Sequence, residues 1–398
     1  MQGLFWLSAS VIGYTYAGYP LLIWACSKVR PQPWQRRVQV RPVSVVMAVH
    51  NGAHLLRGQI EHLAGLDPAY VREIIIVSDG SADETPAILS EIADKRFKAI
   101  VLTEQVGKAT ALNHGISAAT GEILLFVDIR PKITEGALAR LMSNFADPAV
   151  GCVAGELLLS QAGHDGAASA VSGVYWRYEQ WIRNCEAAFD SPVGVYGGFY
   201  AARRALVRPY PEGIILDDMF QPLSIVRQGY RSVLDREAVV LDRWPEKVSG
   251  EFQRKIRTLA GNYQLVARAP WMLGLYNRLW WQLVSHKLLR LVVPYCFLAT
   301  LLSATVLGMH SMGWALLALA QWCFWVLAAV GLKVRLPLVG KLAGGAGALL
   351  VLNLAAVAGL YKFLFTRGPL WKIWSATNQS TQAGHDATTR LGMERGRA

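Results

Sequence analysis

The chain of 398 residues is 53% hydrophobic and 17% charged, so its apolar share exceeds the roughly 45–50% of ordinary soluble domains. This composition excludes a disordered chain, and five scattered Cys without paired spacing exclude a secreted disulfide scaffold. The net charge of +12 is uneven: residues 1–41 carry +5, residues 42–251 carry −7 and residues 252–385 carry +13. Because the middle of the chain is acidic, the excess charge does not indicate nucleic-acid binding.

The first apolar run extends over residues 3–27 and contains no charged residue. It is long enough to span a hydrocarbon core of about 30 Å. A cleaved signal peptide is disfavoured because no basic residue precedes the run. Five basic residues follow it, so the positive-inside rule places residue 1 outside and the next domain in the cytoplasm. We therefore predict an N-terminal transmembrane helix with a basic linker over residues 1–41.

Residues 42–265 alternate short apolar runs with helical stretches, which predicts an α/β domain with a mainly parallel sheet. A helix is expected to begin at Ser81 with a capping box to Glu84, and another to extend over residues 107–120. The predicted strands are Val43–Val49, Glu73–Val77, Ala99–Leu102 and Ile123–Val127.

In such sheets, ligands bind beyond the carboxyl ends of the strands. Polar residues stand at these ends and are the first candidates for a functional site. They are His50 and Asn51 after the first strand, Asp79 after the second, and Asp128 and Arg130 after the fourth.

The C-terminal part begins with residues 266–290, where Trp, Leu and Tyr alternate with basic side chains. This pattern predicts an amphipathic helix in the membrane interface or, equally, a helix packed on the globular domain. About three transmembrane helices are predicted within residues 291–366, followed by a polar tail over residues 367–398. Three crossings would leave the tail outside, whereas Arg367 and Lys372 favour the cytoplasm. Either the Gly-rich last segment is re-entrant or the tail crosses.

Several segments of the middle domain are informative together and in their order. They read Val-Ser-Val-Val-Met-Ala-Val-His-Asn at 43–51, Gly-Lys-Ala-Thr-Ala-Leu-Asn-His-Gly at 107–115 and Leu-Leu-Phe-Val-Asp at 124–128. Together with residues 74–85, 197–204, 217–218 and 251–257, they resemble the family 2 inverting glycosyltransferases. The resemblance implies a GT-A fold, Rossmann-like with a mainly parallel sheet, and transmembrane helices at both ends as in the family's polysaccharide and glycolipid synthases.

The resemblance also implies which residues bind the donor. His50 and Asn51 are expected near the nucleoside, and Asp79 is expected to read the uracil edge. Lys108, at the start of a predicted helix, is expected close to the sugar or the phosphates. Its alternative interpretation is an ordinary solvated lysine.

The fourth strand departs from the family pattern. The family usually carries Asp-x-Asp, whose carboxylates hold Mg²⁺ or Mn²⁺ on the diphosphate, whereas this chain reads Asp128-Ile129-Arg130. Either Asp128 keeps the metal with help from the substrate, or the Arg130 guanidinium pairs with phosphate and partly replaces the metal.

On the acceptor side, the family's Glu-Asp motif corresponds to Asp217-Asp218, so Asp218 is the expected catalytic base. Adjacent carboxylates raise one another's pKa, which suits a base. The family's processive synthases carry Gln-x-x-Arg-Trp, whereas this chain reads Arg-Lys-Ile-Arg-Thr from Arg254. Arg257 is retained, and Arg254 and Lys255 are expected beside the diphosphate. The lost Trp favours transfer of one or a few sugars over a long polymer.

The sequence therefore predicts a multi-pass glycosyltransferase of the inner membrane with a cytoplasmic catalytic domain. It would move a sugar, with inversion, from a nucleotide donor such as a UDP-sugar to a lipid-linked or polysaccharide acceptor in cell-envelope or exopolysaccharide synthesis. Membrane lipids and envelope-assembly proteins are expected partners, and nucleic acid is not. The alternative is a catalytically silent membrane protein that binds a nucleotide sugar for assembly. The broken Asp-x-Asp suggests it, and the retained Asp218 argues against it.

Overall fold

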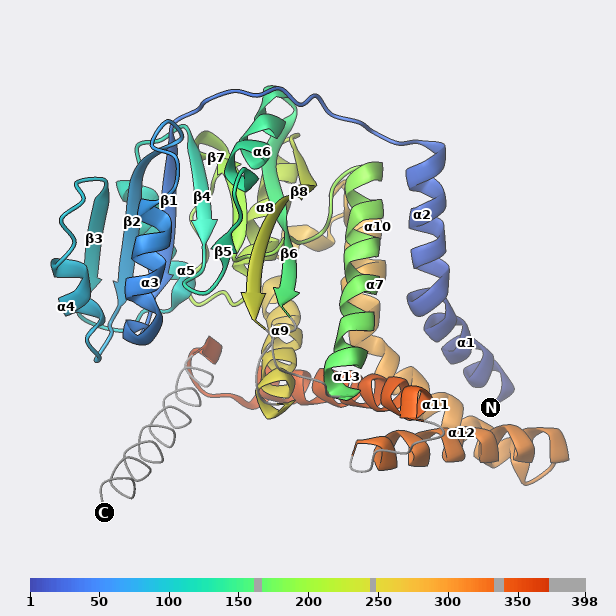
Figure 1. Ribbon diagram of the computed structural model, residues 1–398. Coiled ribbons are helices and arrows are strands. Elements are labelled where there is room, and N and C mark those ends of the chain that lie inside the picture. The colour runs from blue at the N-terminus through green and yellow to red at the C-terminus, as the bar shows by residue number, and fades with distance from the viewer. Residues whose placement is uncertain (161–166, 244–247, 333–339, 372–398) are drawn as a thin grey trace, which may run out of the picture.

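The structure is a computed structural model that describes residues 1–160, 167–243, 248–332 and 340–371 (Figure 1). Its centre is an eight-stranded sheet with the order β3-β2-β1-β4-β7-β6-β8-β5. The strands are β1 (Val43–Val49), β2 (Val71–Asp79), β3 (Phe97–Leu102), β4 (Ile123–Val127), β5 (Lys132–Ile133), β6 (Val150–Ser160), β7 (Phe199–Arg203) and β8 (Arg231–Arg243).

The four strands predicted from apolar runs are confirmed as β1, β2, β3 and β4, which pair in parallel with one another. Their side chains alternate between two apolar cores, one on each face: Val46 and Phe126 belong to one core, Val45 and Val127 to the other. A parallel strand buried on both faces requires such a continuous apolar run. Strand β7 runs antiparallel to β4 and β6, while β6 and β8 are parallel to each other.

Helices cover both faces of the sheet. They are α3 (Ala53–Ala64), α4 (Thr85–Ser90), α5 (Lys108–Ala118), α6 (Ala137–Ser143) and α8 (Asp217–Arg227). The strands β4, β6 and β8 point toward α9 (Val248–Arg268) and the C-terminal helices (Figure 1). The carboxyl ends of the parallel strands therefore face the same side of the domain as α9.

One predicted helix start is wrong. Helix α4 begins at Thr85 rather than at Ser81, and the side chain of its N-cap residue, Glu84, makes no capping hydrogen bond. The Ser81 hydroxyl instead accepts a hydrogen bond from the backbone N–H of Asn51 (3.0 Å), and Asp83 accepts one from Thr85 N–H (3.0 Å). The turn after β2 is thus used to bind the end of β1, and this competes with the capping box.

The N-terminal residues form one continuous helix made of α1 (Gln2–Gly13), a π-helical turn (Tyr14–Gly18) and α2 (Tyr19–Val29). Its second half packs against α7 (Ala167–Phe189) of the globular domain. Three described helices are long and apolar enough to cross a membrane, and this N-terminal helix, predicted to span, is not among them. Its tyrosines, serines and glycines lower its hydropathy.

The three apolar helices are Trp280–Gly308, Met312–Gly331 and Gly345–Phe365. In Figure 1 they are α10 (Trp280–Gln282) continuing through a π-helical turn (Leu283–Leu288) into α11 (Leu289–Gly308), then α12 (Met312–Gly331) and α13 (Gly340–Phe365). The predicted boundary between an interfacial helix ending at residue 290 and a span beginning at 291 therefore falls inside one helix.

Three basic residues just before this boundary, at positions 286, 287 and 290, contact glutamates of the globular domain. Arg290 donates to Glu179 Oε1, and the Lys287 ammonium lies 3.3 Å from Glu179 Oε2. His286 is fully buried between Glu179 Oε2 (3.2 Å) and Glu186 Oε1 (2.8 Å). Both glutamates lie on one face of α7, two turns apart. Within residues 266–290, the part from Trp280 onward is helical and contacts α7, whereas Pro270–Leu273 forms a short 3₁₀ helix. The interfacial position of this segment stays a prediction.

We expect the Glu179→Gln variant to unfold at a clearly lower temperature than wild type. The change leaves the buried Arg290 without its carboxylate partner, and breaking a buried ion pair in this way typically costs about 3–5 kcal/mol. Glu91→Gln is the matched control, since Glu91 forms an exposed pair with Arg57 at 2.8 Å, and such pairs contribute about 0–1 kcal/mol. Thermal unfolding in detergent measures both, and equal midpoints for the two variants would contradict the prediction.

Candidate active site

Three elements bring opposite charges together at the carboxyl end of the sheet. Lys108 begins α5, Asp128 follows β4 and Asp217 begins α8. The Lys108 ammonium lies 3.0 Å from Asp128 Oδ1 and 3.0 Å from Asp217 Oδ2. Burial alone would lower the pKa of Lys108, but the two carboxylates outweigh it and raise that pKa. The ammonium is therefore a fixed positive charge between two carboxylates. It lies at the carboxyl ends of the strands, where ligands of such folds bind.

Asp218 lies beside this group. Burial, followed by the charge of Asp217, raises the pKa of Asp218 to about 6, while Lys108 and Arg183 act in the opposite direction. The Asp218 side chain lies against the bare backbone of Gly197, where an added Cβ would be 3.0 Å from the Asp218 Cβ. A carboxylate with this pKa is ionised at neutral pH and still a useful proton acceptor.

The basic residues of α9 have different environments. Arg257 is exposed, and although desolvation lowers its pKa, the charges of Asp217, Asp128 and Asp218 oppose that shift. The Lys255 ammonium instead lies over the ring of Tyr175 on α7, 5.0 Å from its centroid. Arg254 is exposed on the same helix. The Arg257 guanidinium thus interacts electrostatically with the acidic group formed by Asp128, Asp217 and Asp218.

The residues expected at the nucleoside connect the ends of β1 and β2. His50 Nδ1 lies 2.6 Å from the backbone oxygen of Asp79, and the Asn51 side chain accepts a hydrogen bond from Ala82 N–H (2.8 Å). Asp79 is 3% exposed, and its two carboxylate oxygens accept the backbone N–H groups of Val106 (2.7 Å) and Gly107 (2.9 Å). These contacts give Asp79 a structural role at the start of α5.

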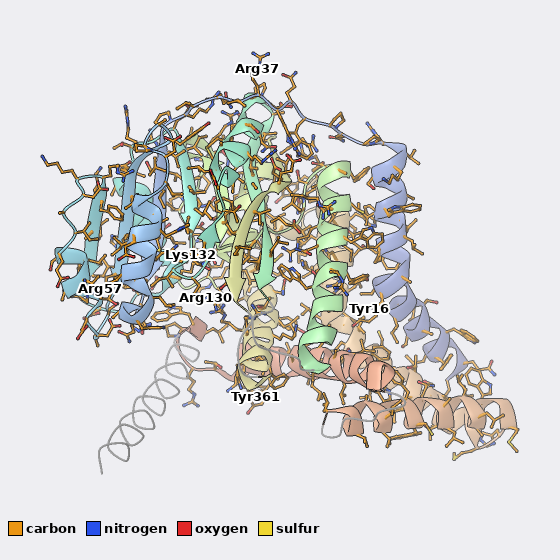
Figure 2. All side chains as sticks on the ribbon, in the orientation of Figure 1. Tyr16, Arg37, Arg57, Arg130, Lys132 and Tyr361 are labelled. Carbon is orange, nitrogen blue, oxygen red and sulfur yellow. The ribbon has the colours of Figure 1, made fainter. Side chains whose placement is uncertain are left out.

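Arg130 does not pair with Asp128. Its guanidinium lies 3.4 Å from Asp242 Oδ2 on β8, and the Tyr196 hydroxyl donates to the same oxygen at 3.4 Å. Burial, then the charges of Asp128 and Asp242, raises the pKa of Tyr196. Figure 2 places Arg130 at the end of the domain that faces α9. Sequence reasoning missed Tyr196 and Asp242, because no motif marks them; the loop before β7 and the packing of β8 bring them beside Arg130.

Among the described residues of this charged group, the Asp128 carboxylate is suited to bind a divalent cation. Within the described residues no set of three or more His, Cys, Asp and Glu side chains is placed to hold a metal ion. Mg²⁺ in nucleotide sites, however, is usually held by one or two carboxylates together with substrate phosphates. Asp128 is one-third exposed, and the ion pair with Lys108 uses its Oδ1. Asp128 therefore has the chemistry and access to hold Mg²⁺ or Mn²⁺ jointly with a diphosphate.

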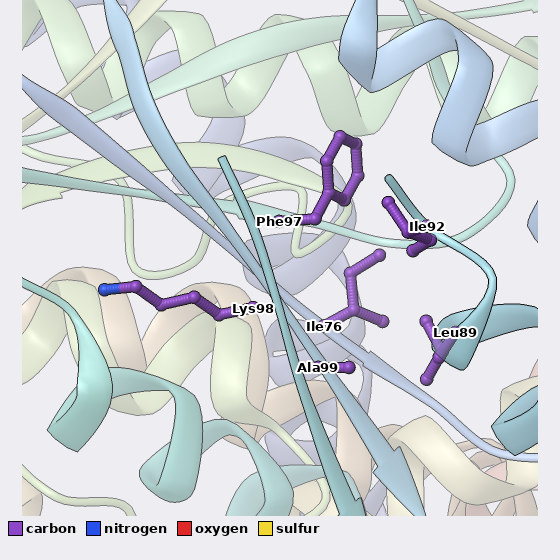
Figure 3. Close-up of a pocket in the computed structure, with 6 residues that line it drawn as sticks. All are labelled: Ile76, Leu89, Ile92, Phe97, Lys98 and Ala99. Atoms are coloured by element: carbon purple, nitrogen blue, oxygen red, sulfur yellow. The ribbon is translucent and has the colours of Figure 1, made fainter. Parts of the chain in front are cut away.

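A small apolar pocket lies elsewhere, between α4 and the edge of the sheet (Figure 3). It is lined by Ile76, Leu89, Ile92, Phe97, Lys98 and Ala99. None of the predicted site residues lines it. It therefore has no part in the candidate site.

Residues 44–208 match the family described as Glycosyl transferase family 2. The chain is 24% identical over 273 residues to a poly-β-1,6-N-acetyl-D-glucosamine synthase of Staphylococcus epidermidis and 23% identical over 240 residues to one of Staphylococcus aureus. The first match covers 65% of each chain, and the second covers 58% of this chain and 57% of the relative. The chain thus spans less than two thirds of the length of these relatives.

Among solved structures, the fold is similar to that of mannosyltransferase PcManGT from Pyrobaculum calidifontis, which was solved in complex with GDP-Man and Mn²⁺. The TM-score is 0.66 at 21% identity, with 92% of this chain and 100% of that chain covered. This likeness confirms the predicted GT-A fold. The region that matches Glycosyl transferase family 2, residues 44–208, lies within this fold, and apolar helices follow the globular domain.

Proposed function

We propose that the protein is a membrane-bound inverting glycosyltransferase that transfers a sugar from a nucleotide-sugar donor to a lipid-linked or polysaccharide acceptor. The observation that carries this proposal is the group of Lys108, Asp128, Asp217 and Asp218 at the carboxyl end of the family 2 sheet. A protein that only binds a nucleotide sugar needs no carboxylate with a raised pKa at this place. A catalytically silent assembly protein is therefore the less favoured function.

In the proposed reaction, Asp218 removes the proton of an acceptor hydroxyl as that oxygen attacks the anomeric carbon of the donor sugar. The bond from this carbon to the diphosphate breaks on the opposite face, and the nucleoside diphosphate leaves with the bonding electrons. One displacement of this kind inverts the anomeric configuration. Lys108 and Arg257 stabilise the negative charge that develops on the diphosphate, and Asp128 would hold a divalent cation that neutralises the same charge.

The donor side is proposed on the contacts around β1 and β2. His50 and Asn51 form the rim of the nucleoside site, and Asp79 acts by holding the backbone of Val106 and Gly107 in place. UDP is the proposed nucleoside diphosphate. Arg130 lies at the same edge, where it is available to a phosphate once its 3.4 Å pair with Asp242 opens. The positive-inside rule supports a cytoplasmic position for this domain in the inner membrane.

A donor panel tests the proposal. The purified full chain, with lipid extract as acceptor, is incubated with UDP-GlcNAc, UDP-glucose, UDP-galactose and GDP-mannose in Mg²⁺ or Mn²⁺, and nucleoside diphosphate release is measured. We expect turnover of a UDP-sugar, loss of turnover in EDTA and its recovery on adding metal, with a product of inverted configuration. UDP binding without turnover of any donor would favour the silent assembly protein instead. Full activity in EDTA would refute the metal role of Asp128.

A further inference from the structure

The segment that follows the last apolar helix returns to the globular domain. Leu370 is 7% exposed and packs with Ile256 and Ala260 of α9 and with Ala355 of α13. In Figure 1 this segment passes α9 and reaches the lower edge of the sheet. Tyr361, near the end of α13, likewise lies beside α9 in Figure 2. We call residues 366–371 the C-terminal strap.

The strap ends, within the described chain, on two loops of the candidate site. A Cβ added to Gly107 would lie 2.8 Å from Cε2 of Trp371, and one added to Gly213 would lie 3.6 Å from its Cδ1. The indole therefore sits between the two loops. Both glycines have positive φ, +91° and +69°, and without side chains they let the indole approach their backbones.

These two loops carry the charged residues of the site. Gly107 directly precedes Lys108, and Gly213 lies one turn before Asp217, which begins α8. Helix α9 holds the second loop as well, because Gln264 donates to the Gly213 oxygen (2.8 Å) and accepts from Ile215 N–H (3.0 Å). The 3.0 Å pair between Lys108 and Asp217 therefore depends on two loops that Trp371 touches from one side and α9 supports from another.

We infer that the C-terminal strap is part of the active site and that Trp371 is a positioning residue, which holds the loops of Gly107 and Gly213 where Lys108 reaches Asp217. The positioning role rests on the proposed function, whereas the course of the strap does not. The catalytic groups are then coupled to the membrane helices through α13 and its contacts with α9.

The course of the strap also determines whether the chain crosses the membrane an odd or an even number of times between residues 280 and 371. The helix Trp280–Gly308 starts on the domain, where Arg290 contacts Glu179, and the strap ends on the domain at Gly107. An even number of crossings therefore separates them, so the three apolar helices do not all cross. Helix α13 packs along α9 and α7 of the domain as well as along α12 and α11, and we assign it to the side of the domain because of these domain contacts. Arg367 is thus inferred to lie on the same side of the membrane as the globular domain, as the positive-inside rule favours.

Cysteine labelling in membranes tests the course of the strap. In a Cys323→Ser background, single variants Arg367→Cys, Arg57→Cys and His310→Cys are treated with a membrane-impermeant maleimide in vesicles of either orientation. All three positions are exposed, in the strap, on the domain and between α11 and α12 respectively. We expect residues 367 and 57 to react from the same side and residue 310 from the opposite side. Labelling of residue 367 together with residue 310 would overturn the inference.

The positioning role is tested with Trp371→Ala, its conservative partner Trp371→Phe and the matched control Trp6→Ala, whose ring is 61% exposed on α1. We expect kcat to fall about tenfold in Trp371→Ala, because misplacing reacting groups by about 1 Å costs up to about 100-fold. Phe should restore most of it. The acid limb of the pH profile should also move upward, because Lys108 lowers the pKa of Asp218, and a merely structural role would not move it.

Hydrogen exchange provides a readout that needs no activity. The amides of residues 105–108 and 212–216 should exchange faster in Trp371→Ala than in Trp6→Ala. If wild type turns over none of the donors but these amides and the labelling behave as expected, the proposed function is refuted. The inferred course of the strap and its contact with the two loops are then retained. Unchanged exchange in both loops, or an unchanged pH profile in an active Trp371→Ala enzyme, would overturn the positioning role.

Discussion

Replacing Asp218 by Asn should slow sugar transfer by about 10²–10⁴ while leaving the protein folded. An amide cannot accept the acceptor proton, and a general base contributes about 10²–10⁴ in rate. The wild-type rate should rise with pH and reach half its maximum near pH 6, because Asp218 must be ionised and its pKa is raised to about 6. The rate of nucleoside diphosphate release in the presence of acceptor, measured from pH 5 to pH 8, checks both statements.

The same substitution has an opposite effect on stability. A carboxyl whose pKa is higher in the folded than in the unfolded state stabilises the fold when protonated, and this contribution is lost as pH rises through the folded pKa. At pH 7.5 the ionised Asp218 carboxylate therefore destabilises the folded state. Asp218→Asn should unfold at the same or a higher temperature than wild type. Glu135→Gln, at an exposed position, is the control for both assays. Normal turnover by Asp218→Asn would end the assignment of the base.

Replacing Lys108 by Met should reduce the rate by about 10²–10³, the size of effect seen when one donor to a developing negative charge is removed. The change removes the ammonium between Asp128 and Asp217 and leaves three carboxylates close together. Because Lys108 lowers the pKa of Asp218, the residual activity should also require a higher pH. Steady-state rates across pH, with saturating donor, measure both effects.

Lys95→Met is the matched control for this charge removal. Lys95 is exposed in the loop between α4 and β3, so the same loss of one positive charge there should leave the rate and the pH profile unchanged. If Lys108→Met loses activity without an upward shift of the acid limb, Lys108 acts on the diphosphate alone and its coupling to Asp218 is refuted. If it retains full activity, the bland interpretation of a solvated lysine is correct.

The sequence predicts those site residues that stand next to a local signal, but it does not predict contacts between residues that are far apart in the chain. Asp128 and Asp217 were predictable because each stands next to a local signal, the end of an apolar strand or a recognisable motif. The pairing of Lys108 with Asp217 was not, since no periodicity reports which strand-end loops meet. Arg130 is the instructive case: its chemistry suggested a phosphate ligand, and the packing of β8 gave it Asp242 as a partner.

The sequence by itself determined the elements whose formation depends on local composition. Continuous Val, Ile and Leu runs gave β1 and β4 their bounds, because a parallel strand covered on both faces admits few other residues. The tertiary structure alone decided where charged residues on apolar segments go. Glu179 pairs with Arg290 inside the protein, and Trp371 reaches Gly107 through contacts that exist only once α13 has packed on α9. Such contacts join residues far apart in the chain, so they depend on which surfaces are buried together.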